Sequence, residues 1–120
     1  MDKKIPAQIL GILLIVTPLF VMYAINPIAK IEAKWVDVSE QSWVIFAMLA
    51  GLGAGAFMAA EDVNKHKLVF ATIFYAVALH AIMHIMHWYK MAGPDMIRSS
   101  LDIAYTVIAS ALALWLWKSK

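Results

Sequence analysis

Three histidines within one apolar segment are the residues of this sequence best suited to chemistry. His80, His84 and His87 are spaced i, i+4 and i+7, so on a helix they lie within roughly 60° of one another. Met91 continues this line and Met83 borders it. Because copper accepts both imidazole and thioether ligands, one of three interpretations of the stripe is a metal site that suits copper.

Asp102, on a later apolar segment, is the predicted acidic partner of the histidines. A helix that begins just before it places the carboxylate about one turn inside the membrane surface, at the depth of His84 and His87. There it would orient an imidazole or ligate a metal itself. The predicted metal ligands are therefore His80, His84, His87 and Asp102. Two other interpretations stay open: a structural polar network that includes Tyr105, and a proton relay or quinone contact.

The rest of the chain carries no recognisable catalytic signature, such as a G-x-S-x-G, H-E-x-x-H, phosphate-loop or dinucleotide-binding motif. The absence of cysteine excludes disulfides, thiolate zinc sites and a cysteine nucleophile. The adjacent Glu61 and Asp62 favour a solvated turn over a catalytic pair. Asp95 is expected to cap a helix start, and Arg98 to reach the membrane surface as a cation. We therefore expect no catalytic activity from this chain alone.

The composition shows which solvent surrounds these residues. The chain has 120 residues, 63% hydrophobic and 15% charged, and a mean hydropathy of +0.75. Soluble domains are about 45–50% apolar and about 25% charged, and a chain this short cannot bury so much apolar surface. The sequence therefore predicts one membrane domain, residues 1–120, in contact with lipid. Its formal charge of +2 does not indicate nucleic-acid binding.

Four apolar segments, about 5–25, 43–60, 68–89 and 99–117, each approach the ~20 residues that cross a bilayer. Short connections make neighbouring helices antiparallel. The predicted fold is all-α, an antiparallel bundle of four transmembrane helices. Pro18 is expected to kink the first helix and Asn26-Pro27 to end it.

The connection before the second helix allows two interpretations. Residues 28–38 have apolar positions at helical spacing, which suits a short interfacial helix, but an ordered loop explains them equally well. Asp37 to Glu40 resembles a capping box at the start of the second helix.

Lysine and arginine predict the orientation in the cell (plasma) membrane. One side carries six such residues and the other side carries four. The first group is Lys3, Lys4, Lys65, Lys67, Lys118 and Lys120, and the second is Lys30, Lys34, Lys90 and Arg98. Since the cytoplasmic side is the richer one, both termini are predicted to be cytoplasmic. The first segment is longer than a signal-peptide core and is expected to be retained.

Small residues every fourth position form a predicted packing stripe on the second helix. They are Ala47, Gly51, Gly55 and Ala59. Such a stripe lets another helix approach closely. That helix belongs either to this chain's own bundle or to another subunit.

The layout, the Asn26-Pro27 break and the histidine-bearing third helix are similar to DoxX-like small membrane proteins, some of which are tied to respiratory oxidoreductases. The size and the His/Met-bearing outer face resemble the small accessory subunits of copper membrane monooxygenases, of the archaeal ammonia monooxygenase type. This resemblance implies a structural, non-catalytic subunit within a larger membrane oxidoreductase complex, with copper in this chain or in a neighbouring subunit. The alternative is a self-sufficient membrane copper-binding protein.

Overall fold

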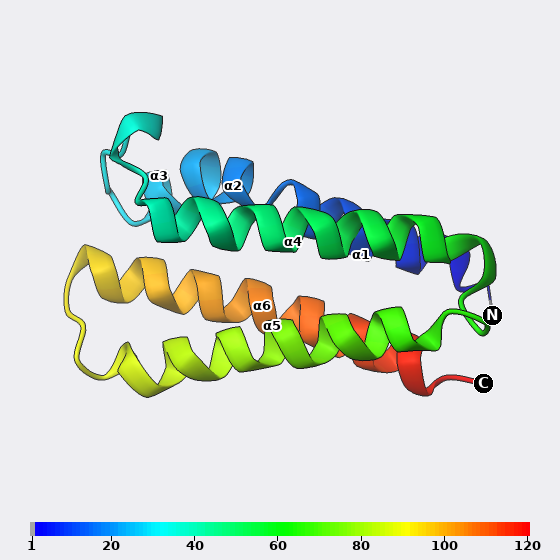
Figure 1. Cartoon of the computed structure of the whole chain (residues 1–120). Coiled ribbons are helices and arrows are strands. Elements are labelled where there is room, and N and C mark those ends of the chain that lie inside the picture. Colours follow the sequence, from blue (N-terminus) through cyan, green and yellow to red (C-terminus); the bar gives the residue numbers. More distant parts are fainter. Residues whose placement is uncertain (1) are drawn as a thin grey trace.

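The computed structural model describes residues 2–120, and over that range the chain forms helices and turns without a strand (Figure 1). The predicted all-α class is confirmed. The elements in chain order are α1 (Lys4–Ile15), α2 (Thr17–Phe20), the π-helical turn η1 (Val21–Ile25), α3 (Asn26–Ile28), the 3-10 turn η2 (Trp35–Asp37), α4 (Glu40–Ala59), the 3-10 turn η3 (Ala60–Asp62), α5 (Lys67–Trp88) and α6 (Pro94–Lys118).

Three helices are long and apolar enough to cross a membrane, namely Glu40–Asp62, Lys67–Trp88 and Pro94–Lys118. The pair Lys4–Ile15 and Thr17–Ile28 meets the same test together but is bent by 62°, so the number rises to four if this pair forms one span. These lengths and compositions are consistent with an integral membrane protein.

The bend in the first segment follows the chemistry of Pro18. Proline lacks an N–H and its ring clashes with the carbonyl one turn earlier, so it breaks a continuous helix. The α-helix is interrupted at Val16, and the Thr17 hydroxyl donates to the Leu13 carbonyl at 3.0 Å. The predicted kink is confirmed.

The predicted end at Asn26-Pro27 is wrong by a few residues. Pro27 lies in the first turn of α3, where the missing N–H is not needed. The helical path ends after Ile28, where Lys30 adopts a positive φ of 59° and the Ile31 N–H donates back to the Asn26 carbonyl at 2.8 Å.

The interfacial helix proposed for residues 28–38 is wrong, since this segment is an ordered loop with one 3-10 turn. Aromatic contacts hold the loop: the Trp35 ring stacks on Trp43 with centroids 5.7 Å apart. The cap of α4 is Ser39, whose side chain accepts from the Ser42 N–H at 3.1 Å. The capping box expected from Asp37 is wrong, because that carboxylate accepts from the Lys34 N–H instead.

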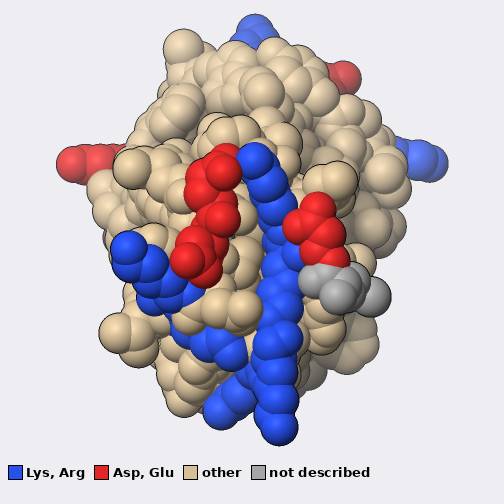
Figure 2. Space-filling view, turned by 90° about the vertical axis from the view of Figure 1, so that its right-hand side faces the viewer, with Lys and Arg blue, Asp and Glu red and all other residues tan. Residues whose placement is uncertain are grey.

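The helices pack as two pairs, α1 with α4 and α5 with α6, and both termini lie at the same end (Figure 1). Fully buried side chains join the pairs, among them Leu10, Phe70, Ile73 and Leu116. At this end basic and acidic side chains gather on the surface (Figure 2). The lysines predicted to share one side of the membrane include Lys3 and Lys67, whose ammonium groups both donate to the Ser119 carbonyl, at 3.2 and 2.6 Å.

A close contact between helices lies at Gly11 of α1 and Gly53 of α4. A Cβ atom added at Gly53 would lie 2.5 Å from the Gly11 carbonyl oxygen, so the two backbones touch. Of the predicted stripe, Ala59 is buried and Gly55 lies near Val69 of α5, whereas Ala47 and Gly51 are exposed. The tight contact thus uses a different face of α4 from the one that the stripe suggested.

Candidate functional site

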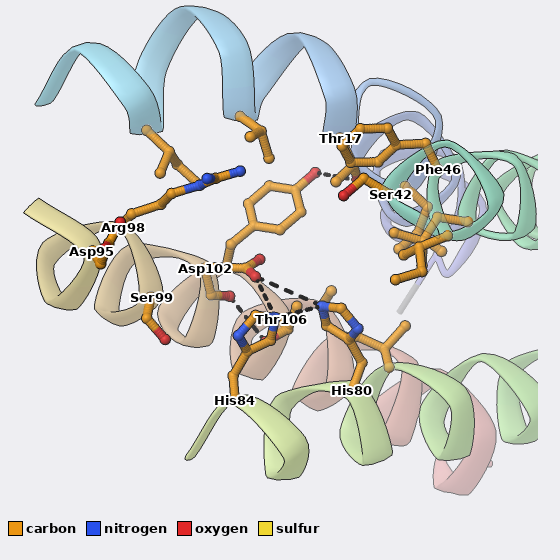
Figure 3. Close-up of a pocket in the computed structure, with 18 of the residues that line it drawn as sticks. Thr17, Ser42, Phe46, His80, His84, Asp95, Arg98, Ser99, Asp102 and Thr106 are labelled. Atoms are coloured by element: carbon orange, nitrogen blue, oxygen red, sulfur yellow. Dashed lines mark hydrogen bonds and ion pairs between the residues drawn. The ribbon is translucent and has the colours of Figure 1, made fainter. Parts of the chain in front are cut away.

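A cavity of about 390 Å³ lies between the two helix pairs, toward the end opposite the termini (Figure 3). Apolar side chains form its deep part: Leu14, Leu49, Val77 and Ala109. Polar side chains from α5 and α6 form its middle and outer parts. Pockets of this size, apolar with a few convergent polar groups, are typical of ligand sites.

His80, His84 and Asp102 converge in this cavity (Figure 3). The Asp102 Oδ2 atom lies 2.7 Å from the His84 Nε2 and 3.6 Å from the His80 Nε2, and the two Nε2 atoms are 3.1 Å apart. The three side chains are partly buried, between 20 and 30% exposed. Two helices therefore bring three possible ligand atoms to one point.

This triangle of atoms has dimensions that suit a metal ion. With these three edges its circumscribed radius is about 1.9 Å, so a point exists about 2.0–2.1 Å from every atom, the length of a zinc–imidazole bond. Three protein ligands leave further coordination positions for a small molecule.

His87, the fourth predicted ligand, lies outside the site. Its side chain is exposed, and its Nδ1 is 2.8 Å from the Met83 carbonyl oxygen of its own helix. Met83 is 55% exposed, whereas Met91 lines the cavity. The histidine stripe thus divides into two residues that face the cavity and one that does not.

Tyr105 lines the cavity but contacts the first segment of the chain, not the histidines. Its hydroxyl donates to the Leu13 carbonyl and lies 3.3 Å from the Thr17 hydroxyl. Its ring stacks on Phe20 with centroids 4.7 Å apart. Tyr105 therefore connects α6 to the bend between α1 and α2 through a hydrogen bond and a ring contact. It also lines the cavity.

Sequence reasoning did not place Asp95, Arg98 or Ser99 in the cavity, nor the hydroxyl residues Thr17, Ser42 and Thr106 that also line it. Asp95 had been expected to cap the start of this helix, which is wrong because the cap position is Gly93 and no side chain bonds there. Arg98 had been expected to reach the membrane surface. Asp95 and Arg98 both lie on the α6 face of Asp102, seven and four residues before it. Their spacing from Asp102 places them on one face of α6, but only the packing of the helices shows that this face borders the cavity.

Comparisons with known protein families, curated proteins and solved structures find no match to this chain. The functional argument therefore depends on the geometry of the cavity.

Proposed function

We propose that this chain is a membrane metal-binding protein that holds one divalent ion of the Cu²⁺ or Zn²⁺ class through His80, His84 and Asp102. The convergence of these three side chains on one point carries the proposal. Two imidazoles and a carboxylate suit borderline metals, and Met91 on the same cavity wall favours copper among them.

The proposed topology has four spans, with the bent α1 to α3 segment as the first. Both termini are cytoplasmic and the cavity faces the outer side, because lysine is concentrated at the end with the termini. The chain contains no cysteine, so single cysteines introduced at the exposed positions Ala92 and His66 by Ala92→Cys and His66→Cys can be labelled separately. A membrane-impermeant maleimide should label the first in intact cells and the second only after permeabilisation. The reverse pattern would invert the topology.

Metal titration of the purified chain in detergent tests the site itself. One ion per chain is expected, and His84→Ala or Asp102→Asn should weaken binding by at least about 100-fold. His87→Ala is the matched control, since it removes a histidine of the same helix that lies outside the cavity. Equal losses in His84→Ala and His87→Ala would point to adventitious surface binding and overturn the proposal.

A second candidate function is an accessory subunit of a membrane oxidoreductase. The exposed positions Ala47 and Gly51 favour it, because a Cβ at Gly51 meets no atom within 4 Å and a partner helix has room to approach. Intact complexes from native membranes should then contain larger redox subunits, and Gly51→Leu should release this chain from them while its helicity is retained. A chain that is monomeric in mild detergent would count against this role.

A further inference from the structure

Arg98 is an exposed side chain that also lines the cavity. Arg98 extends from α6 toward the opposite wall (Figure 3). Within residues 2–120, neither an ion pair nor a hydrogen bond engages its guanidinium group, although Asp95 lines the same cavity. An unpaired guanidinium with planar donors in a ligand-sized cavity is suited to a carboxylate group.

A buried hydroxyl beside Arg98 also lacks a partner. Ser99 lines the cavity and is only 4% exposed, and its Oγ atom has no hydrogen-bond partner among the described residues. Buried polar groups are normally hydrogen-bonded, so the Ser99 hydroxyl is available to bond a water molecule or a ligand group that enters the cavity. This observation does not depend on the charge of Arg98, and Ser99 lines the same cavity.

The charges of the loaded site favour a monoanion. Histidines that ligate a metal are neutral. With a divalent ion bound, the carboxylates of Asp95 and Asp102 and the guanidinium of Arg98 leave the cavity one positive charge in excess. Without the ion the cavity is one charge negative. An anion should therefore bind only after the metal.

The order of residues along α6 gives the direction of the ligand. Arg98 lies toward the helix start, Asp102 follows one turn later, and Ala109 lies about 10 Å deeper at ~1.5 Å per residue. The deep wall is apolar. A ligand with one acidic end and one hydrocarbon end matches this gradient.

We infer that the cavity binds a monocarboxylate with an apolar chain, its carboxylate between the metal ion and Arg98 and its chain along the deep apolar wall. This inference rests on the proposed metal site. It makes the metal and the carboxylate mutually dependent, because each must raise the affinity of the other by the same factor.

Metal titration with Co²⁺ and Zn²⁺ in the presence of octanoate tests the inference. Octanoate should tighten metal binding about tenfold and change the visible spectrum of the Co²⁺ form. Acetate lacks the chain and octanol lacks the charge, so both should act weakly. Arg98→Gln should abolish the octanoate effect without weakening metal binding alone, and Ser99→Ala should reduce the effect.

Lys90→Gln is the matched control, because Lys90 is a cation near the same end that does not line the cavity. If metal binds but octanoate has no effect, or has the same effect in Arg98→Gln, the carboxylate inference fails and the metal site stands. If octanol acts as strongly as octanoate, the cavity selects hydrocarbon and not an anion. Failure of the wild-type chain to bind metal would remove both proposals.

Discussion

The two halves of this helix bundle differ in how closely the helices approach. Toward the termini, α1 and α4 touch backbone to backbone at Gly11 and Gly53, and Phe70 and Leu116 are fully buried. Toward the opposite end the helix pairs enclose a cavity lined by charged and polar side chains. The bundle is therefore tightly packed toward the termini and has its polar cavity toward the opposite end.

The bend at Pro18 accounts for much of the difference. Up to Ile15 the first helix follows α4, but the next segment turns by 62°. Polar groups within a membrane are costly unless they face a protein interior or a cavity. The closely packed half stabilises the bundle, while the other half keeps the side chains of His80, His84 and Asp102 partly buried.

The largest predicted effect tests the closely packed half directly. Gly53→Ala places a Cβ atom 2.5 Å from the Gly11 carbonyl and 2.9 Å from the Ile15 side chain. Overpacking of this kind costs about 1–3 kcal/mol. We expect the free energy of unfolding in mixed micelles to fall by that amount.

Gly51→Ala is the control, since its new Cβ meets nothing within 4 Å. The gain in helix propensity, about 1 kcal/mol, should leave this variant as stable as the wild type or more stable. Equal stability of Gly53→Ala and Gly51→Ala would contradict the backbone contact and remove the contrast between the two halves.

A smaller effect is expected at the junction of the two halves. Tyr105→Phe removes the hydroxyl that donates to the Leu13 carbonyl but keeps the ring that stacks on Phe20. The Thr17 hydroxyl still donates to that carbonyl, so the expected loss is about 0.5–1.5 kcal/mol.

A double-mutant cycle with Thr17→Val sharpens this prediction. The two hydroxyls share one acceptor, so removal of both should cost more than the sum of the single losses. Additive losses would mean that the two hydroxyls act independently and that the bend does not depend on their shared acceptor.

The sequence predicted the long helices well, because hydropathy alone decides which segments a membrane accepts. Their ends depended on local chemistry that was partly misjudged. α6 begins at Pro94, earlier than predicted, since proline is accommodated in the first helical turn after Gly93 with its φ of 62°.

The site was predicted in part. Helical spacing and depth brought His80, His84 and Asp102 together, but spacing could not show that the His87 ring turns back to the Met83 carbonyl. Arg98 was missed because its position depends on how α6 is rotated toward the other helix pair. That rotation is set by packing between distant segments, which the local pattern does not contain.

The same limit explains the packing stripe. Gly51 and Gly53 lie on nearly opposite faces of α4, since two residues turn a helix by about 200°. Both faces are smooth enough for a neighbour. Only the docking of α1 decides that Gly53 is the one in contact.

The smallest predicted effect lies on the charged end of the closely packed half. The Lys4 Nζ atom is 2.8 Å from the Glu61 Oε1 atom, but the side chains are 46% and 72% exposed. Exposed pairs contribute little to stability and are screened by salt. Glu61→Gln should therefore lower the unfolding free energy only slightly at low ionic strength, and the loss should disappear in high salt.

Glu32→Gln is the control. It changes the net charge by the same amount, at an exposed carboxylate that takes part in none of the ion pairs of residues 2–120. If Glu61→Gln cost as much as Gly53→Ala, the stability of this half would come from the charges at its end and not from the contact between its backbones.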